Sequence, residues 1–184
     1  MGRSPRQFVP SGIYHVYSRG SNKQPIFRFD SDRVDFLTCF ERVVAQTQLR
    51  CLAYCLMHNH YHLVLETRDG RVSGAIQGLN GRYSLRFNKR YDREAHLFKN
   101  RFGAVEQRAT GQLLWTLRYV VTNPVESGLC GRPHEWLWSS YRASAGLDRP
   151  PRFLDVGGLL SYFGDVPAKA TARYRAFVDD YVGV

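Results

Sequence analysis

The chain has 184 residues, of which 43% are hydrophobic, and carries a formal net charge of +10. This length and apolar content suit one packed domain, or one domain with an appendage. No apolar run approaches the length needed to span a membrane, which argues against a membrane-spanning helix.

The positive charge comes almost entirely from arginine, with 22 arginines and four lysines. Arginine is the residue best suited to forked contacts with phosphate and to stacking on bases. A small basic domain with 14% aromatic residues is therefore a candidate for nucleic-acid binding. The alternative is a generic basic protein with no such ligand.

The cysteines predict free thiols in a reducing compartment, because no Cys-x-x-Cys pair occurs. No apolar run follows the basic start, so no signal peptide is expected and the predicted location is the cytoplasm, in association with the nucleoid. The four cysteines are Cys39, Cys51, Cys55 and Cys130.

Hydrophobic periodicity predicts the elements in the order strand, helix, strand, strand, helix, strand. This is the split βαβ, ferredoxin-like arrangement of an α+β protein, with two helices on one face of an antiparallel sheet. After a loose basic arm at residues 1–11, the predicted elements are a strand at 13–18, a helix capped by Asp30 or Ser31 and running to about 48, strands at 49–57 and 60–67, a helix from 72, and a strand at 101–106.

The remainder of the chain is predicted to be mainly helical. A helix capped by Thr110 should run to Asn123 and end there, because Pro124 disfavours the helical conformation of the residue before it. Residues 131–152 are expected to be irregular, and two shorter helices are expected at 155–163 and 168–182.

Two histidines on the third predicted strand are candidate metal ligands. Side chains at positions i and i+2 of a strand point to one face, so His60 and His62 should lie ~6.5 Å apart along the strand. Two neutral imidazoles at that spacing can share one divalent metal. The alternative is a pair of ordinary strand histidines. His15 on the first strand is expected to be packed or hydrogen-bonded, with a place near the site as the alternative.

The helix at 110–123 carries two further candidates. Tyr119 and Asn123 are one turn apart and therefore project together. A phenol is a possible nucleophile, and an amide oxygen is a possible ligand for a hard metal ion. The alternative is a half-exposed tyrosine and a helix-ending asparagine. The apolar stripe that should face the sheet consists of Leu113, Leu117, Val120 and Val121.

These motifs together resemble the single-tyrosine HUH transposases of small insertion sequences, and most closely the REP-associated tyrosine transposases. The resemblance rests on His60-Tyr61-His62 and on Tyr119-Val120-Val121-Thr122-Asn123-Pro124-Val125. It covers roughly residues 12–145, and this implies a transposase-like domain at 1–145 with a C-terminal helical tail at 146–184. The chain departs from the family pattern at His58, where proline is usual. Further matching segments are Tyr14-His15-Val16 with Arg19-Gly20, Tyr54-Cys55-Leu56-Met57, Tyr83-Ser84 with Phe87-Asn88, His96-Leu97-Phe98, Arg101-Phe102 and Trp138-Ser139-Ser140-Tyr141.

The resemblance implies cleavage and rejoining of single-stranded DNA through a covalent tyrosine intermediate. His60, His62 and Asn123 would hold one Mg²⁺ or Mn²⁺ ion, and Tyr119 would attack the scissile phosphorus. The implied partner is single-stranded or hairpin DNA of the REP type. A monomer is favoured over a dimer, and the general base and the DNA sequence recognised are not determined.

Cationic residues interleaved with aromatics on and beyond the second predicted helix are candidates for DNA contact. Arg19 and an arm containing Arg3 and Arg6 are further candidates, whereas Tyr83 and Phe87 are expected to be core residues. The predicted DNA-binding residues are Arg19, Arg82, Arg86, Arg90, Arg93, Lys99 and Arg101.

Two other functions fit parts of the sequence. A non-cleaving regulator that binds hairpin DNA or RNA could have the same fold, but it would need neither the histidine pair nor Tyr119. A structural zinc site could draw on Cys51 and Cys55, expected on one face of a strand, together with His58, His60 and His62.

Overall fold

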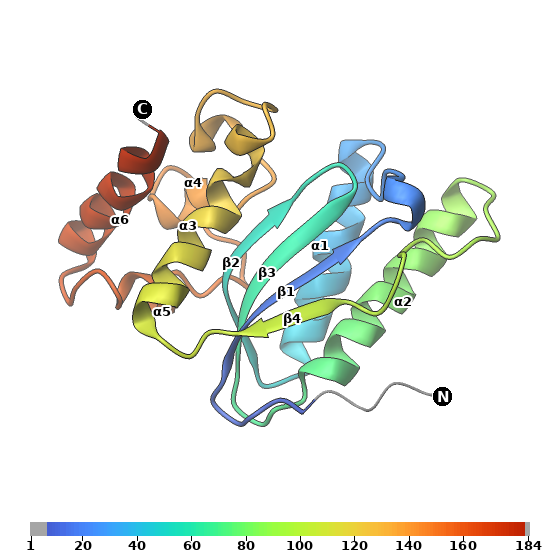
Figure 1. Cartoon of the computed structure of the whole chain (residues 1–184), viewed down its shortest axis with the longest axis horizontal. Helices are drawn as coiled ribbons and strands as arrows, with labels where there is room; N and C mark the ends of the chain where they lie inside the picture. Colours follow the sequence, from blue (N-terminus) through green and yellow to red (C-terminus); the bar gives the residue numbers. More distant parts are fainter. Residues whose placement is uncertain (1–6, 183–184) are drawn as a thin grey trace.

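The computed structural model describes residues 7–182 and has the predicted α+β fold. An antiparallel sheet of four strands has the order β2-β3-β1-β4. Figure 1 shows α1 and α2 on one side of the sheet and α3, α5 and α6 on the other. The elements are β1 (Ile13–Arg19), α1 (Asp30–Ala45), β2 (Leu49–Leu56), β3 (His60–Thr67), α2 (Val72–Arg90), β4 (Gly103–Glu106), α3 (Thr110–Glu126), α4 (Tyr141–Ser144), α5 (Val156–Leu160) and α6 (Pro167–Val182).

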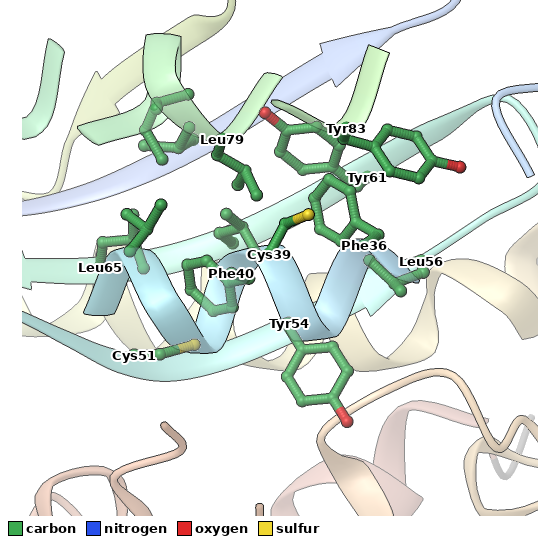
Figure 2. Packing of buried hydrophobic residues seen from close by; sticks show 14 of the residues in the cluster. Phe36, Cys39, Phe40, Cys51, Tyr54, Leu56, Tyr61, Leu65, Leu79 and Tyr83 are labelled. Atoms are coloured by element: carbon green, nitrogen blue, oxygen red, sulfur yellow. The ribbon is translucent and has the colours of Figure 1, made fainter. Parts of the chain in front are cut away.

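The first core lies between the sheet and the helices α1 and α2. Phe36 and Phe40 of α1 are fully buried and, like Tyr61 of β3, belong to this core (Figure 2). Tyr83 and Phe87 of α2 are buried there too, as expected. Because side chains alternate along a strand, burying Tyr61 on this face turns its two histidine neighbours to the other face.

The second core lies on the opposite face, between β2, β3 and the helices α3, α5 and α6. The predicted apolar stripe of α3 is buried in this core, which the C-terminal residues Tyr174 and Val178 of α6 also enter. Because α6 shares this core with α3, the tail packs on the helix that carries Tyr119. The boundary after residue 145 stays a prediction.

A segment after α3 covers the outer edge of β2. The backbone N–H of Leu56 donates to Trp138 O at 2.8 Å, and that of Ser140 donates to Tyr54 O at 2.9 Å. An exposed strand edge is a template for pairing with other chains, and this segment protects it.

Several predicted boundaries were wrong. α3 does not end at Asn123 but includes Pro124 and runs to Glu126. A proline in the last turn removes only one helical hydrogen bond, and the Ser127 N–H still donates to Asn123 O at 3.0 Å. α1 ends at Ala45, β4 begins at Gly103, α5 spans only Val156–Leu160, and the expected irregular region 131–152 contains α4 and a short 3₁₀ turn at Pro133–Glu135.

The predicted cap of α1 was also wrong. Neither Asp30 nor Ser31 caps the helix; the carboxylate of Asp32 accepts the backbone N–H groups of Arg28 at 2.8 Å and Phe29 at 3.1 Å. A carboxylate in the first turn accepts hydrogen bonds from N–H groups that lack helical partners, and its negative charge interacts favourably with the positive end of the helix dipole. Of the basic arm predicted at residues 1–11, residues 1–6, with Arg3 and Arg6, lie outside the described residues.

A bulge in β2 contradicts the expectation that two cysteines share one face. The register of β2 against β3 shifts between Cys51 and Ala53. Cys51 therefore joins the core beside α1, whereas Cys55 joins the core beside α3. Burial raises the pKa of both thiols. Two thiols in separate cores cannot ligate one ion, which removes the structural zinc site built on this pair.

Candidate active site

Strand pairing brings three histidine rings together on the α3 face of the sheet. β1 pairs with β3 so that Tyr17 lies opposite His62. His15 Nε2 and His62 Nδ1 are 2.8 Å apart, which is a hydrogen bond. The His60 and His62 rings lie 4.9 Å apart between centroids and perpendicular to each other. The two predicted ligands are adjacent, and His15 lies in the same cluster rather than in a separate core.

The helix α3 places Tyr119 and Asn123 over these rings. The Tyr119 ring centroid lies 5.6 Å from that of His62 and 6.1 Å from that of His15. The Asn123 amide lies close enough to both His60 and Tyr119 to shift the pKa of each. The start of α3 is anchored by Thr116, whose hydroxyl donates to Gln107 Oε1 at 2.7 Å in a buried position. All four predicted catalytic and metal-site residues are therefore in one place.

Two atoms of this cluster are buried without any hydrogen-bond partner among residues 7–182. They are His62 Nε2 and Asn123 Oδ1. An unpaired buried polar atom is costly, so native structures rarely retain one without a function. An imidazole nitrogen and an amide oxygen are both donors that a divalent metal accepts. The residues therefore fit a bound divalent ion.

The remaining predicted ligand, His60, also has one ring nitrogen that could bind a metal ion. Its Nδ1 lies 2.7 Å from Asn59 Oδ1, which leaves Nε2 as the available nitrogen. No cluster of three His, Cys, Asp or Glu side chains suited to a metal is present among residues 7–182. The set found here has only two such residues, and its third member is an amide.

The electrostatics keep the three imidazoles neutral near pH 7. Burial lowers the pKa of His15 to about 4 and lowers that of His62 well below its ordinary value. Burial also lowers the pKa of His60, and the positive charge of Arg19 lowers it further. A metal-ligating imidazole must be neutral, so these shifts favour ligation at neutral pH.

The pKa of Tyr119 is shifted in the direction opposite to those of the histidines. Its pKa is raised, first by burial and then by the negative charge of Glu126, while the nearby Asn123 amide lowers it. The phenol is therefore protonated at neutral pH and needs help to act as a nucleophile.

The predicted DNA-binding cations fall into two groups. Arg86 and Arg90 pair with Asp35 of α1, and Arg90 also contacts the buried Asp32 at 2.6 Å. Arg82 reaches Gln46 at 3.5 Å, and the Arg93 guanidinium lies 5.7 Å from the Phe87 ring centroid. These four side chains are engaged within the protein.

The second group begins at the end of β1, and of its members only Arg19 is paired with a histidine of the cluster. Arg19 is the strand partner of His60, and its backbone carbonyl accepts the Lys99 N–H at 2.9 Å. Lys99 and Arg101 line a groove of about 990 Å³ between α2 and residues 94–102. The α2 wall of this groove is polar, with Gln77, Asn80, Ser84 and Asn88.

Sequence reasoning missed several members of the site. The sequence predicts a packed or hydrogen-bonded His15, with a place near the site as the alternative, and the structure shows the hydrogen bond to His62. Sequence reasoning does not single out Tyr17, Asn59 or Trp115. The sequence contains one signal for His15 and Tyr17. They stand two positions apart on β1, as His60 and His62 do on β3, so each pair points to one face of its strand. Only the pairing of the two strands shows that both pairs share a face.

The unusual His58 contacts Arg33 rather than the cluster. Arg33 is buried, and its Nη2 donates to His58 Nδ1 at 3.1 Å. The guanidinium also lies 5.7 Å from the Trp136 ring centroid and 5.6 Å from that of Trp138. The backbone carbonyl of His58 accepts the N–H groups of Ile26 and Phe27, so the turn is held without proline.

Comparison with solved structures supports the fold. The structure of the REP-associated tyrosine transposase bound to a REP hairpin is similar, with a TM-score of 0.67 and 14% identity over 84% of this chain and 94% of that one. A Deinococcus radiodurans protein assigned as a transposase (TM-score 0.46, 13% identity, 65% of this chain and 95% of that one) and the tRNA(His) guanylyltransferase of Saccharomyces cerevisiae (0.48, 10%, 99% and 82%) resemble it less.

Comparison by sequence identifies the family. No curated protein matches the chain. Among residues 7–182, no helix is long and apolar enough to cross a membrane.

Residues 8–126 match the family described as transposase IS200 like, and they make up more than half of the chain. The chain therefore belongs to the IS200-like transposase family.

Proposed function

We propose that the protein cleaves and rejoins single-stranded DNA next to REP-like hairpins through a covalent tyrosine intermediate. The observation that carries this proposal is the meeting of Tyr119 with the unpaired buried atoms His62 Nε2 and Asn123 Oδ1. A protein that only binds DNA needs neither a nucleophile nor unpaired donors at the same point. The similar transposase structure bound to a REP hairpin supports hairpin DNA as the substrate class.

His60, His62 and Asn123 would hold one divalent ion, Mg²⁺ or Mn²⁺. When bound, such an ion polarises a phosphate oxygen and stabilises the charge that develops in the transition state. All three ligands are neutral, so the ligand set itself adds no negative charge. We expect the free protein to bind the ion more weakly than a closed cysteine site binds zinc.

Tyr119 would act as the nucleophile. Its phenolic oxygen would form a bond to the scissile phosphorus as it loses its proton, and the bond from phosphorus to the 3′ oxygen would break. The products would be a 5′-phosphotyrosine on the protein and a free 3′-OH that takes up a proton. Attack by the 3′-OH of a second strand on this linkage would release Tyr119 and join the strands.

Arg19, Lys99 and Arg101 would contact the DNA backbone nearest the site. Arg19 lies opposite His60 in the sheet, and its positive charge lowers the pKa of His60, so the charge acts at the site. Lys99 and Arg101 continue this positive charge into the groove beside α2. Arg82, Arg86, Arg90 and Arg93 remain candidates, but their contacts within the protein must be exchanged for phosphate.

A covalent-trapping assay tests this proposal. The protein is incubated with labelled single-stranded hairpin DNA from the flanks of its own gene, with Mn²⁺ or with a chelator, and run on a denaturing gel. We expect a metal-dependent adduct with wild type and none with Tyr119→Phe, while native gels show nearly equal hairpin binding. The matched control is Tyr17→Phe, whose ring lies 6.2 Å from His62 and which should still form the adduct.

The outcomes separate the competing functions. A clear native-gel shift without any wild-type adduct would contradict cleavage and favour the hairpin-binding regulator. Equal loss of binding and adduct in Tyr119→Phe would show that Tyr119 is structural. Monomeric action is part of the proposal, and size measurement of the trapped complex tests it.

A further inference from the structure

Each of the two proposed histidine ligands is hydrogen-bonded through Nδ1 to a different neighbour. His60 Nδ1 meets Asn59 Oδ1 at 2.7 Å, and His62 Nδ1 meets His15 Nε2 at 2.8 Å. A neutral imidazole carries its proton on one nitrogen only, and the other nitrogen then has the lone pair. Which nitrogen carries the proton decides whether Nε2 can ligate a metal.

The contacts of Asn59 determine the protonation of His60. Asn59 Nδ2 donates to the backbone carbonyl of Lys23 at 3.1 Å, and a carbonyl can only accept. This contact orients the amide so that its oxygen, which can also only accept, faces His60. His60 must therefore donate from Nδ1, and its Nε2 holds the lone pair.

The second pair is decided by burial. If His15 donated to His62, the His62 proton would sit on Nε2, which is buried with no acceptor in the described part of the chain. A buried N–H without an acceptor is costly. If His62 donates from Nδ1 to His15, then Nε2 is a bare lone pair on the side of the ring where no other described residue pairs with it. Only this arrangement protonates both rings, His60 and His62, at Nδ1.

We propose that Asn59 and His15 are positioning residues that hold His60 and His62 as Nδ1–H tautomers, with both Nε2 lone pairs available to one divalent ion. The metal part of this inference rests on the proposed function, whereas the tautomers are a property of the metal-free protein. Partners of this kind orient ligating histidines in many metal sites, where they are usually carboxylates or carbonyls. Here an amide and a third imidazole do the same without adding charge.

The first test is nuclear magnetic resonance of the metal-free protein with ¹⁵N-labelled histidine. We expect both His60 and His62 to show a protonated Nδ1 and an unprotonated Nε2 at neutral pH. Asn59→Ala should convert only His60 to a mixture of tautomers, and His15→Leu should do so only for His62. A protonated Nε2 in either wild-type ring, or identical spectra in wild type and variants, would overturn the inference.

The second test is the affinity for Mn²⁺ alone, measured by titration calorimetry without DNA. Loss of such a partner typically weakens metal binding by about 10- to 100-fold. We expect this loss for Asn59→Ala and for His15→Leu, and we expect His15→Gln to restore most of it because its amide oxygen can accept from His62. Unchanged affinity in both loss variants would overturn the positioning role.

Asn88→Ala is the matched control. Like Asn59, Asn88 donates from Nδ2 to a backbone carbonyl, that of Ala95, at 2.9 Å, but it lies on α2 at the other face of the sheet. We expect unchanged Mn²⁺ affinity in this variant, and a loss equal to that of Asn59→Ala would mean that the effect is general destabilisation. If wild type binds no Mn²⁺ yet shows the expected tautomers, the metal in the proposed function fails while the tautomer assignment stands.

Discussion

Trp115 and Tyr119 of α3 lie one turn apart with their rings stacked, 5.2 Å between centroids and 5° between planes. Tyr119 also meets the His62 ring edge-on, at 78°. The phenol is thus held between an indole on its own helix and an imidazole on β3. Trp115 remains 53% exposed, so the stack borders solvent where DNA would approach.

This stack predicts that Trp115 orients the nucleophile. Trp115→Ala should leave Tyr119 free to rotate and should slow adduct formation, by up to about 100-fold because small displacements of a reacting group have large effects on rate. Trp115→Phe should retain most of the rate, since a phenyl ring can still stack. Single-turnover trapping kinetics measure the rate, and equal rates for all three proteins would contradict this role.

The two groups of cations should respond differently to substitution. Lys99→Ala with Arg101→Ala should weaken hairpin binding and reduce the slope of log affinity against log salt by about one for each lost phosphate contact. Arg90→Ala, whose side chain is paired with Asp32 and Asp35, is the control and should lower stability with little effect on the slope. A reversed pattern would place the DNA on the side of α1.

The stability of the fold should fall in acid because of Asp32. Burial raises the pKa of this carboxyl, but the backbone N–H groups of Phe29 and Arg28 and the side chains of Tyr91 and Arg90 lower it more, and the net pKa is below its ordinary value. A carboxyl with a lowered folded pKa stabilises the fold above its unfolded pKa of about 3.9. This contribution is lost as the pH falls through the folded pKa.

Urea unfolding at a series of pH values measures this effect. We expect the free energy of unfolding of wild type to decrease steeply below about pH 4, and that of Asp32→Asn to be lower at neutral pH and less dependent on pH in this range. Parallel curves for the two proteins would show that other carboxyls dominate.

Gly103 should be required for the position of Tyr17 beside the histidines. A Cβ at residue 103 would lie 2.2 Å from Cζ of the Tyr17 ring. Tyr17 is 41% exposed, so its ring can swing outwards, and Gly103→Ala should cost less than about 1 kcal/mol of stability. If the ring of Tyr17 supports His62, Gly103→Ala and Tyr17→Ala should slow adduct formation equally. A normal rate in Gly103→Ala would mean that the ring has no such role.

Much of the fold and four residues of the candidate site could be predicted because their signals are local. Alternation along β3 places His60 and His62 on one face, and helical spacing in α3 projects Tyr119 and Asn123 together. These relations depend only on the backbone geometry of one element. The sequence alone therefore determined the order of the strands and helices up to α3 and the two halves of the site, each on its own strand or helix.

The tertiary structure decided how those halves are completed. The His15–His62 hydrogen bond depends on the register of β1 against β3, and the separation of Cys51 from Cys55 depends on a bulge in the pairing of β2. The ion pair of Arg90 with Asp32 depends on how α2 packs on α1. Such contacts join residues far apart in the chain, and no local periodicity encodes which of them meet.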